Sequence, residues 1–206
     1  MPTPSNLLPH PDLAAAAPVL QQYLTRMAQT ITPDRFLDWC DPVLLNTLHN
    51  GFASVAAHEG SVWLVDQTHE YLVNAYNNGP QAERLRGFRQ PLSEGIISMV
   101  LATEQGFAEI EVYRHMDHSK LVDQALGVST YAMVAVPFYF VSGCRGVISC
   151  VQLTQVSKSG DAVTPAAPLP GGFDNESLRT MQRVAHAVRT LLEHRLLLAA
   201  LGLDHL

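Results

Sequence analysis

The chain has 206 residues, of which 47% are hydrophobic and 16% are charged, so it is long and apolar enough to bury the core of one globular domain. Its formal net charge is −6, and its 13 lysines and arginines are scattered, which argues against a nucleic-acid-binding protein. No apolar run reaches about 18 residues, so no membrane span is predicted. The first residues lack the basic segment of a secretory signal, and three sparse cysteines favour a reducing compartment, so we expect the protein to be cytoplasmic.

Residues 1–40 are predicted to form an irregular tail followed by a helix. Four prolines fall within residues 1–11, which disfavours regular structure there. From Leu13 to Ile31, apolar residues recur at alternating steps of four and three, a heptad-like spacing typical of helices that pack along one another. We therefore expect a dimerisation helix here, preceding a domain that spans residues 41–200.

The domain is predicted to begin with a helix over about residues 41–57, with Asp41 as its N-cap. Residues 60–78 alternate in the manner of a β-hairpin, with Trp63 on one face of the first strand and Val62 and Leu64 on the other. Because both faces of this strand are apolar, we expect both to be covered by other elements.

The middle of the chain alternates short elements with polar connections. Residues 91–106 predict a short helix capped by Ser93 and stopped by Gly106, and a strand follows near residues 107–110. The polar segment 111–130 predicts a loop and one short helix over residues 119–126.

Residues 131–153, "YAMVAVPFYFVSGCRGVISCVQL", predict two long apolar strands joined by a tight turn. The glycines of "SGCRG" are expected to supply the positive φ values of that turn. Residues 154–172 are rich in Ser, Pro and Gly and predict a mobile loop.

The last predicted helix runs from the cap Asp174 to about Leu201. Its apolar residues occupy the a and d places of a heptad, and the residues are Leu178, Met181, Ala185, Val188, Leu192 and Ala199. Such a stripe serves either an intramolecular core or a dimer seam. The helix is longer than a compact domain needs, so we expect a dimer interface formed by the N- and C-terminal helices.

This order of elements resembles a GAF domain. The residues that carry the likeness are "GSVWLVD", "PLSEGIISMVLATEQG", "VAVPF" with "GCRGVISCVQL", and "FDNESLRTMQRVAHAVRTLLEHRLL". The resemblance implies an α+β fold with a central antiparallel sheet of about five or six strands. It also implies terminal helices on one face of the sheet, and short helices and loops over a small-molecule pocket on the other.

The resemblance does not identify a ligand or cofactor. Members of the family bind cyclic nucleotides, bilins, haem, small anions or metabolites, and some reduce free methionine sulfoxide. The Asn-Lys-Phe-Asp-Glu set of the cyclic-nucleotide members cannot be laid onto this sequence. Residues 41–143 contain no cysteine, which disfavours bilin attachment and methionine sulfoxide reduction. No serine has the elbow sequence of a hydrolase either.

Five residues are candidates for ligand contact. Arg114, His115 and His118 fall in the run "RHMDH" with Asp117, where an arginine could bind an anionic group and a histidine could donate beside it. The alternatives are a solvated loop or, less favoured, a metal site, for which His-x-x-His alone supplies too few ligands. Trp63 and Tyr131 lie on predicted strands and could line a pocket or belong to the core.

These features together predict a non-catalytic regulatory domain that binds a small molecule or a protein partner and signals through dimer helices. One alternative is a structural adaptor whose pocket is filled by its own side chains. The other is a thiol-dependent redox enzyme or sensor based on Cys144, beside Arg145 in the predicted turn, whereas Cys150 is expected to be an inert core residue.

Overall fold

The computed structural model describes residues 11–141, 143–154 and 169–203. The predicted tail over residues 1–11 and the predicted loop over residues 154–172 therefore lie largely outside the described residues. The strands are β1 (Glu59–Val65), β2 (Tyr71–Asn77), β3 (Arg89–Pro91), β4 (Phe107–Ile110), β5 (Ser129–Phe140) and β6 (Gly143–Thr154). The helices are α1 (Pro11–Ala28), η1 (Phe36–Trp39), α2 (Pro42–Ser54), α3 (Ala82–Leu85), α4 (Ile96–Thr103), η2 (Val112–Arg114), α5 (Leu121–Leu126) and α6 (Asn175–Ala200).

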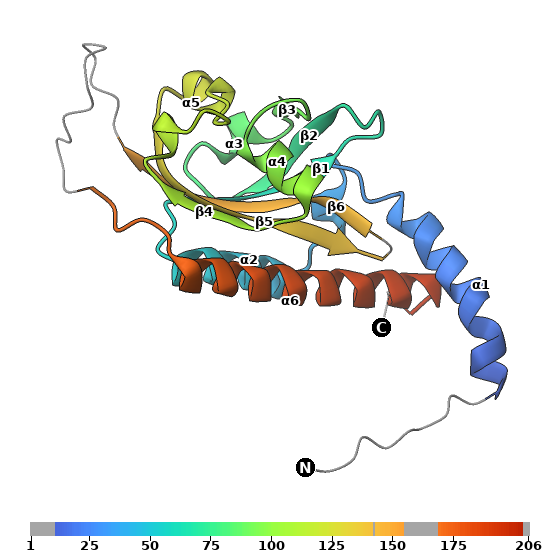
Figure 1. The fold of residues 1–206 in the computed structure, drawn as a ribbon. Helices are drawn as coiled ribbons and strands as arrows, with labels where there is room; N and C mark the ends of the chain where they lie inside the picture. Colours follow the sequence, from blue (N-terminus) through green and yellow to red (C-terminus); the bar gives the residue numbers. More distant parts are fainter. Residues whose placement is uncertain (1–10, 142, 155–168, 204–206) are drawn as a thin grey trace.

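The six strands form one antiparallel sheet in the order β3-β2-β1-β6-β5-β4, with helices on both faces (Figure 1). Helices α2 and α6 cover one face, where their apolar side chains form a cluster with Val62, Leu64 and the strand residues beside them. Helices α3, α4 and α5 cover the other face, where a second cluster surrounds Trp63. The predicted α+β fold, with terminal and short helices on opposite faces, is confirmed.

The β5–β6 hairpin occupies the middle of the sheet, as predicted. Strand β6 pairs with β1 and β5, and β5 pairs also with β4, so neither strand is an edge. The turn differs from the prediction because Val141, rather than a glycine, has the positive φ of 58°. Gly143 and Gly146 lie within β6 instead, and Ser142 is outside the described residues.

The heptad stripe of α6 is mainly a core stripe. Met181, Ala185, Val188 and Leu192 are buried against the sheet and α2, together with Leu196 in the next turn. The expectation that this stripe forms a dimer seam is therefore wrong for these positions, because an apolar stripe is equally required to cover a sheet.

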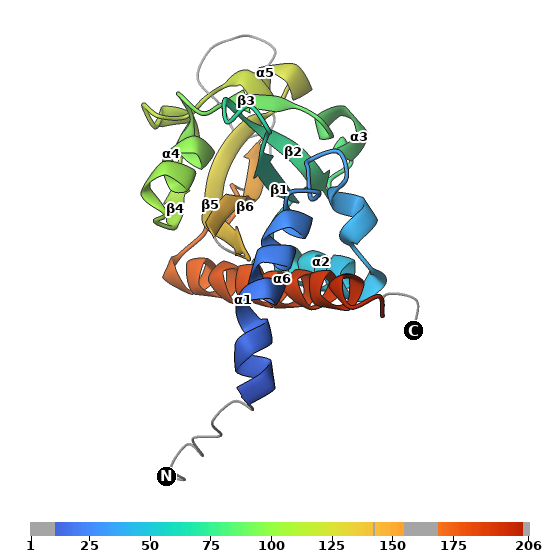
Figure 2. The same cartoon turned by 90° about the vertical axis from the view of Figure 1, so that its right-hand side faces the viewer.

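Helix α1 contacts the domain mainly through its C-terminal end. Ala28 and the following Ile31 are buried, whereas Val19 is 70% exposed and Tyr23 is 49% exposed. The helix crosses the C-terminal part of α6 and its first turns extend away from the domain (Figure 2). In the described ranges, no helix combines the length and hydropathy that a bilayer span requires.

Two of three predicted helix caps are confirmed. Asp41 accepts a hydrogen bond from the Leu44 amide at 2.8 Å, and Asp174 accepts one from the Ser177 amide at 2.8 Å. The prediction for Ser93 is wrong, because Gly95 holds the N-cap position of α4 with a φ of 91° that only glycine adopts readily.

Candidate functional site

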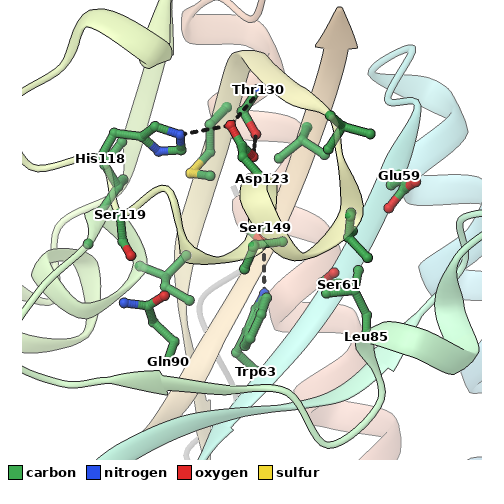
Figure 3. Close-up of a pocket in the computed structure, with 18 of the residues that line it drawn as sticks. Glu59, Ser61, Trp63, Leu85, Gln90, His118, Ser119, Asp123, Thr130 and Ser149 are labelled. Atoms are coloured by element: carbon green, nitrogen blue, oxygen red, sulfur yellow. Dashed lines mark hydrogen bonds and ion pairs between the residues drawn. The ribbon is translucent and has the colours of Figure 1, made fainter. Parts of the chain in front are cut away.

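A cavity lies between the sheet and the short elements that cover its second face (Figure 3). Its floor includes Ser61 and Trp63 from β1 and Ser149 from β6, and its roof includes Asp123 and Leu126 from α5. The cavity volume is about 70 Å³. This is well below the roughly 300 Å³ at which drug-sized ligand sites begin, so the cavity as it stands accommodates only a few heavy atoms.

Two sets of side-chain hydrogen bonds link three strands of the floor. The period-2 alternation of β1 places Glu59, Ser61 and Trp63 on the same face of the sheet. The Trp63 indole Nε1 donates to the Ser149 hydroxyl at 3.1 Å, across the β1–β6 pair. The Asn77 amide of β2 donates to the Ser61 hydroxyl at 2.9 Å and to the Glu59 carboxylate at 3.3 Å. These side chains are therefore held in fixed orientations around the cavity.

The roof is tied to the sheet by His118, Asp123 and Thr130, which we call the roof latch. The Asp123 carboxylate accepts hydrogen bonds from the Thr130 amide at 2.9 Å and from the Thr130 hydroxyl at 2.7 Å. The His118 Nε2 lies 3.1 Å from the same carboxylate, and the His118 side chain is only 5% exposed. A single carboxylate thus joins α5 to the loop before it and to β5, and all its contacts can be seen in Figure 3.

Two carboxylates line the cavity, and Glu59 has fewer hydrogen-bond partners than Asp123. The residue is 5% exposed, and its side chain lies directly beneath Gly79, where an added Cβ would overlap it. Burial raises the pKa of Glu59 above its ordinary value of 4.5, and the hydrogen bond from Asn77 offsets this only in part. The ionised form of this side chain therefore destabilises the folded chain relative to the protonated form.

Replacing Glu59 by glutamine is expected to remove the pH-dependent destabilisation that the ionised carboxylate causes in the folded chain. A carboxyl whose pKa is raised by folding contributes most stability below its ordinary pKa of 4.5, and this contribution is lost as pH rises through the higher pKa of the folded state. The free energy of unfolding of Glu59→Gln, measured by urea denaturation, should therefore rise relative to that of the wild type between about pH 4, below the ordinary pKa, and about pH 7. Glu109→Gln, on an exposed carboxylate of β4, is the control. The same difference at both pH values would contradict the assignment.

The structure brings two of the five predicted candidates into the cavity, and these are Trp63 and His118. Arg114 and His115 are not among the lining residues. The Arg114 side chain is 68% exposed and pairs with Glu111 at 2.7 Å, and the His115 ring packs edge-on against Phe107 at 5.6 Å.

Tyr131 lies in the hydrophobic cluster on the opposite face of the sheet, under α2 and α6. A register shift in the β5–β6 pair between Thr130 and Ala132 causes this placement. Thr130 and Met133, three residues apart, consequently both line the cavity. The run that contains His115 and His118 forms no metal centre, and no group of three potential metal ligands occurs in the described part of the chain.

The residues that sequence reasoning missed are Glu59, Asp123, Thr130 and Ser149. The strand alternation that puts Trp63 on one face of β1 also puts Ser61 and Glu59 on that face, so extending it towards the start of the strand would have found Glu59. The roof latch leaves no periodic pattern in the sequence, since Asp123 belongs to a short helix and Thr130 precedes a bulge.

None of the three cysteines, all of which lie in the described residues, lines the cavity. Burial raises the pKa of the Cys40 thiol to about 12 and also raises the pKa of the Cys144 thiol. Cys150 is fully buried, its thiol lies 3.7 Å from the Met181 sulfur, and burial raises its pKa as well. The prediction that Cys150 is a core residue is confirmed, and no thiol has the lowered pKa of a reactive cysteine.

Neither a family model nor a curated protein sequence matches the chain. Solved structures do match. A GAF domain of a phosphoenolpyruvate-protein phosphotransferase from Coxiella burnetii has a TM-score of 0.59 at 13% identity, over 85% of this chain and 94% of that one. The free methionine-R-sulfoxide reductase from Neisseria meningitidis, solved with its substrate, has a TM-score of 0.53 at 18% identity, over 89% of this chain and 92% of that one. The cyanobacteriochrome receptor PixJ has a TM-score of 0.51 at 15% identity, over 72% of this chain and 91% of that one.

Proposed function

Since the chain has the fold of GAF domains, we propose that it is a non-catalytic regulatory domain whose cavity binds a small molecule. The observation that carries the proposal is the cavity beneath α5, where oriented polar groups line an otherwise apolar chamber. Occupancy of the cavity would shift the equilibrium between two positions of the roof, as any ligand does that binds one state better. The receptor among the structural neighbours shows that a sensory role is compatible with this fold.

The roof is the element through which binding would be transmitted. The roof latch connects α5 to β5, and β5 packs on its other face against α6. A movement of α5 that pulls on Thr130 would therefore reach the helices on the opposite face. The output would be a protein partner that reads the position of these helices.

Filling the cavity is expected to abolish ligand binding. Val122 lines the cavity from α5, so Val122→Trp would place an indole in its volume of about 70 Å³. Leu121→Trp is the matched control, because Leu121 is the neighbouring residue, is 39% exposed and does not line the cavity. Native mass spectrometry of freshly purified protein should detect a co-purified small molecule in the wild type and in Leu121→Trp but not in Val122→Trp. Equal retention in all three would place the ligand elsewhere.

We also propose that the chain forms a homodimer through α1 and the C-terminal end of α6. The support is the apolar surface that remains after the core is formed, which comprises Val19, Tyr23 and Leu201, with Leu201 55% exposed. Exposed apolar surface of this kind is a common feature of interaction sites.

Introducing a charge on this surface is expected to dissociate the dimer. Val19→Glu would bury an unpaired carboxylate in the interface, so sedimentation equilibrium should show a dissociation constant raised by about tenfold or more. Gln21→Glu, on the opposite side of α1, should leave the dissociation constant unchanged. A monomeric wild type at micromolar concentration would remove this part of the proposal.

The structural adaptor remains the second candidate because the cavity is small. A volume of about 70 Å³ is well below the roughly 300 Å³ at which drug-sized ligand sites begin. An adaptor would bind its protein partner equally well with and without the Val122→Trp substitution, whereas a sensor would not.

A thiol-dependent enzyme is the weakest candidate. The reductase among the structural neighbours shows that the fold can carry redox chemistry. In this chain, however, the raised pKa values of Cys40 and Cys144 disfavour the thiolate that such chemistry needs.

A further inference from the structure

The charges around the cavity are unusual for a chain that contains 13 lysines and arginines. The lining includes the carboxylates of Glu59 and Asp123 and the imidazole of His118, but no lysine or arginine. The Asp123 carboxylate already has three contacts, which are the Thr130 amide, the Thr130 hydroxyl and His118. Glu59 is therefore the charged group whose hydrogen-bonding capacity is still open toward an occupant.

A buried carboxylate that makes no salt bridge is costly, so its presence calls for an explanation. Glu59 is 5% exposed, and within the described residues it takes part in no salt bridge. Its hydrogen bond is the one from the Asn77 amide, at 3.3 Å. One amide satisfies only part of the acceptor capacity of a carboxylate, which has about four lone-pair sites.

We infer that the cavity selects a small organic cation, a protonated amine with a short apolar body whose ammonium group faces Glu59. This inference rests on the proposed ligand-binding function and names the chemical class of the ligand. An ammonium has three donors and would complete the acceptors of Glu59 beside the Ser61 hydroxyl. Leu85, Val122 and Met133 would surround the apolar body, and Trp63 borders the same space.

The size and charge of the cavity together exclude most other ligand classes. A volume of about 70 Å³ leaves no room for a nucleotide or a tetrapyrrole unless the roof opens. A phosphate or carboxylate group would approach two carboxylates with no guanidinium or ammonium to offset them. The N-cap Gly95 and the first residues of α4, Ile96 and Ile97, also border the cavity. They favour negative charge through the helix dipole, so a small carboxylate is the competitor that a test must include.

The test compares butylammonium, butyrate and butanol, which share one chain length and differ in charge. Each is titrated into the full-length protein near neutral pH, and the indole N–H resonance of Trp63 reports occupancy because this group lies in the floor of the cavity. We expect butylammonium to bind about tenfold or more tightly than butyrate and butanol. In Glu59→Gln its affinity should fall by about tenfold or more, whereas Glu109→Gln should leave it unchanged.

Three results would overturn the inference. These are butyrate or butanol binding as tightly as butylammonium, an unchanged butylammonium affinity in Glu59→Gln, or no response of the Trp63 resonance to butylammonium. The comparison of the three probes on the wild type does not depend on the folding of any variant. If butyrate or butanol moves the Trp63 resonance and butylammonium does not, the cation inference fails while the proposed binding function stands. Absence of any co-purified molecule in the wild type would instead count against the proposed function itself.

Discussion

Replacing Gly146 by alanine is expected to destabilise the protein by about 3 kcal/mol or more, which is at the upper end of the cost of overpacking. A Cβ atom at Gly146 would overlap the backbone carbonyl of Trp63 on the neighbouring strand. Backbone atoms of β1 cannot rotate away as a side chain does, so the β1–β6 pair would have to separate in the middle of the sheet. Urea denaturation should show the loss as a lower transition midpoint.

Gly143 provides the matched control for this substitution. It lies in the same strand, three residues earlier, and an added Cβ would meet no atom within 4 Å. Gly143→Ala should therefore change the free energy of unfolding by less than about 1 kcal/mol. Equal effects of the two substitutions would show that Gly146 does not face a close neighbouring strand, and the central position of the hairpin would then be in doubt.

Replacing Leu192 by alanine is expected to cost about 2–5 kcal/mol of unfolding free energy, the range for a fully buried leucine. Leu192 is 0% exposed and belongs to the cluster that α6 forms with the sheet and α2. Because this contact is made within one chain, the loss should be independent of protein concentration. Thermal or urea denaturation at two concentrations measures both quantities.

Leu201→Ala is the control, because it makes the same truncation of a leucine at an exposed position. Leu201 ends α6 and is 55% exposed, so its truncation should cost less than about 1 kcal/mol in the monomer. If the loss in Leu192→Ala became smaller on dilution, the heptad stripe of α6 would be a seam between chains rather than part of the core, because an interface contact stabilises only the associated state.

The fold could be predicted because its strongest signals are local. The hydrophobic alternation of residues 60–78 and the two apolar strands after Tyr131 identify a sheet covered on both faces. The sequence could not show what packs against the apolar stripe of α6. The same a and d spacing is found in a helix that covers a sheet of its own chain and in a helix that packs against a helix of another chain.

The site was predictable only where it follows strand alternation. Trp63 was placed correctly on a face of β1, whereas Tyr131 was displaced to the other face by a bulge that no sequence pattern marks. The roof latch joins a short helix to the following strand through Asp123 and Thr130, and such tertiary contacts leave no periodic trace. The turn at Val141 was missed for a related reason, since glycine is the usual residue at a positive φ and here it is not used.

The most direct measurement of the central claim is a crystal structure of freshly purified protein, refined without an assumed ligand. The account predicts electron density for a small molecule in the cavity bounded by Ser61, Trp63 and Ser149 below and by α5 above. A cavity closed by its own side chains, with the roof latch unchanged and no ligand density, would contradict it and favour the adaptor.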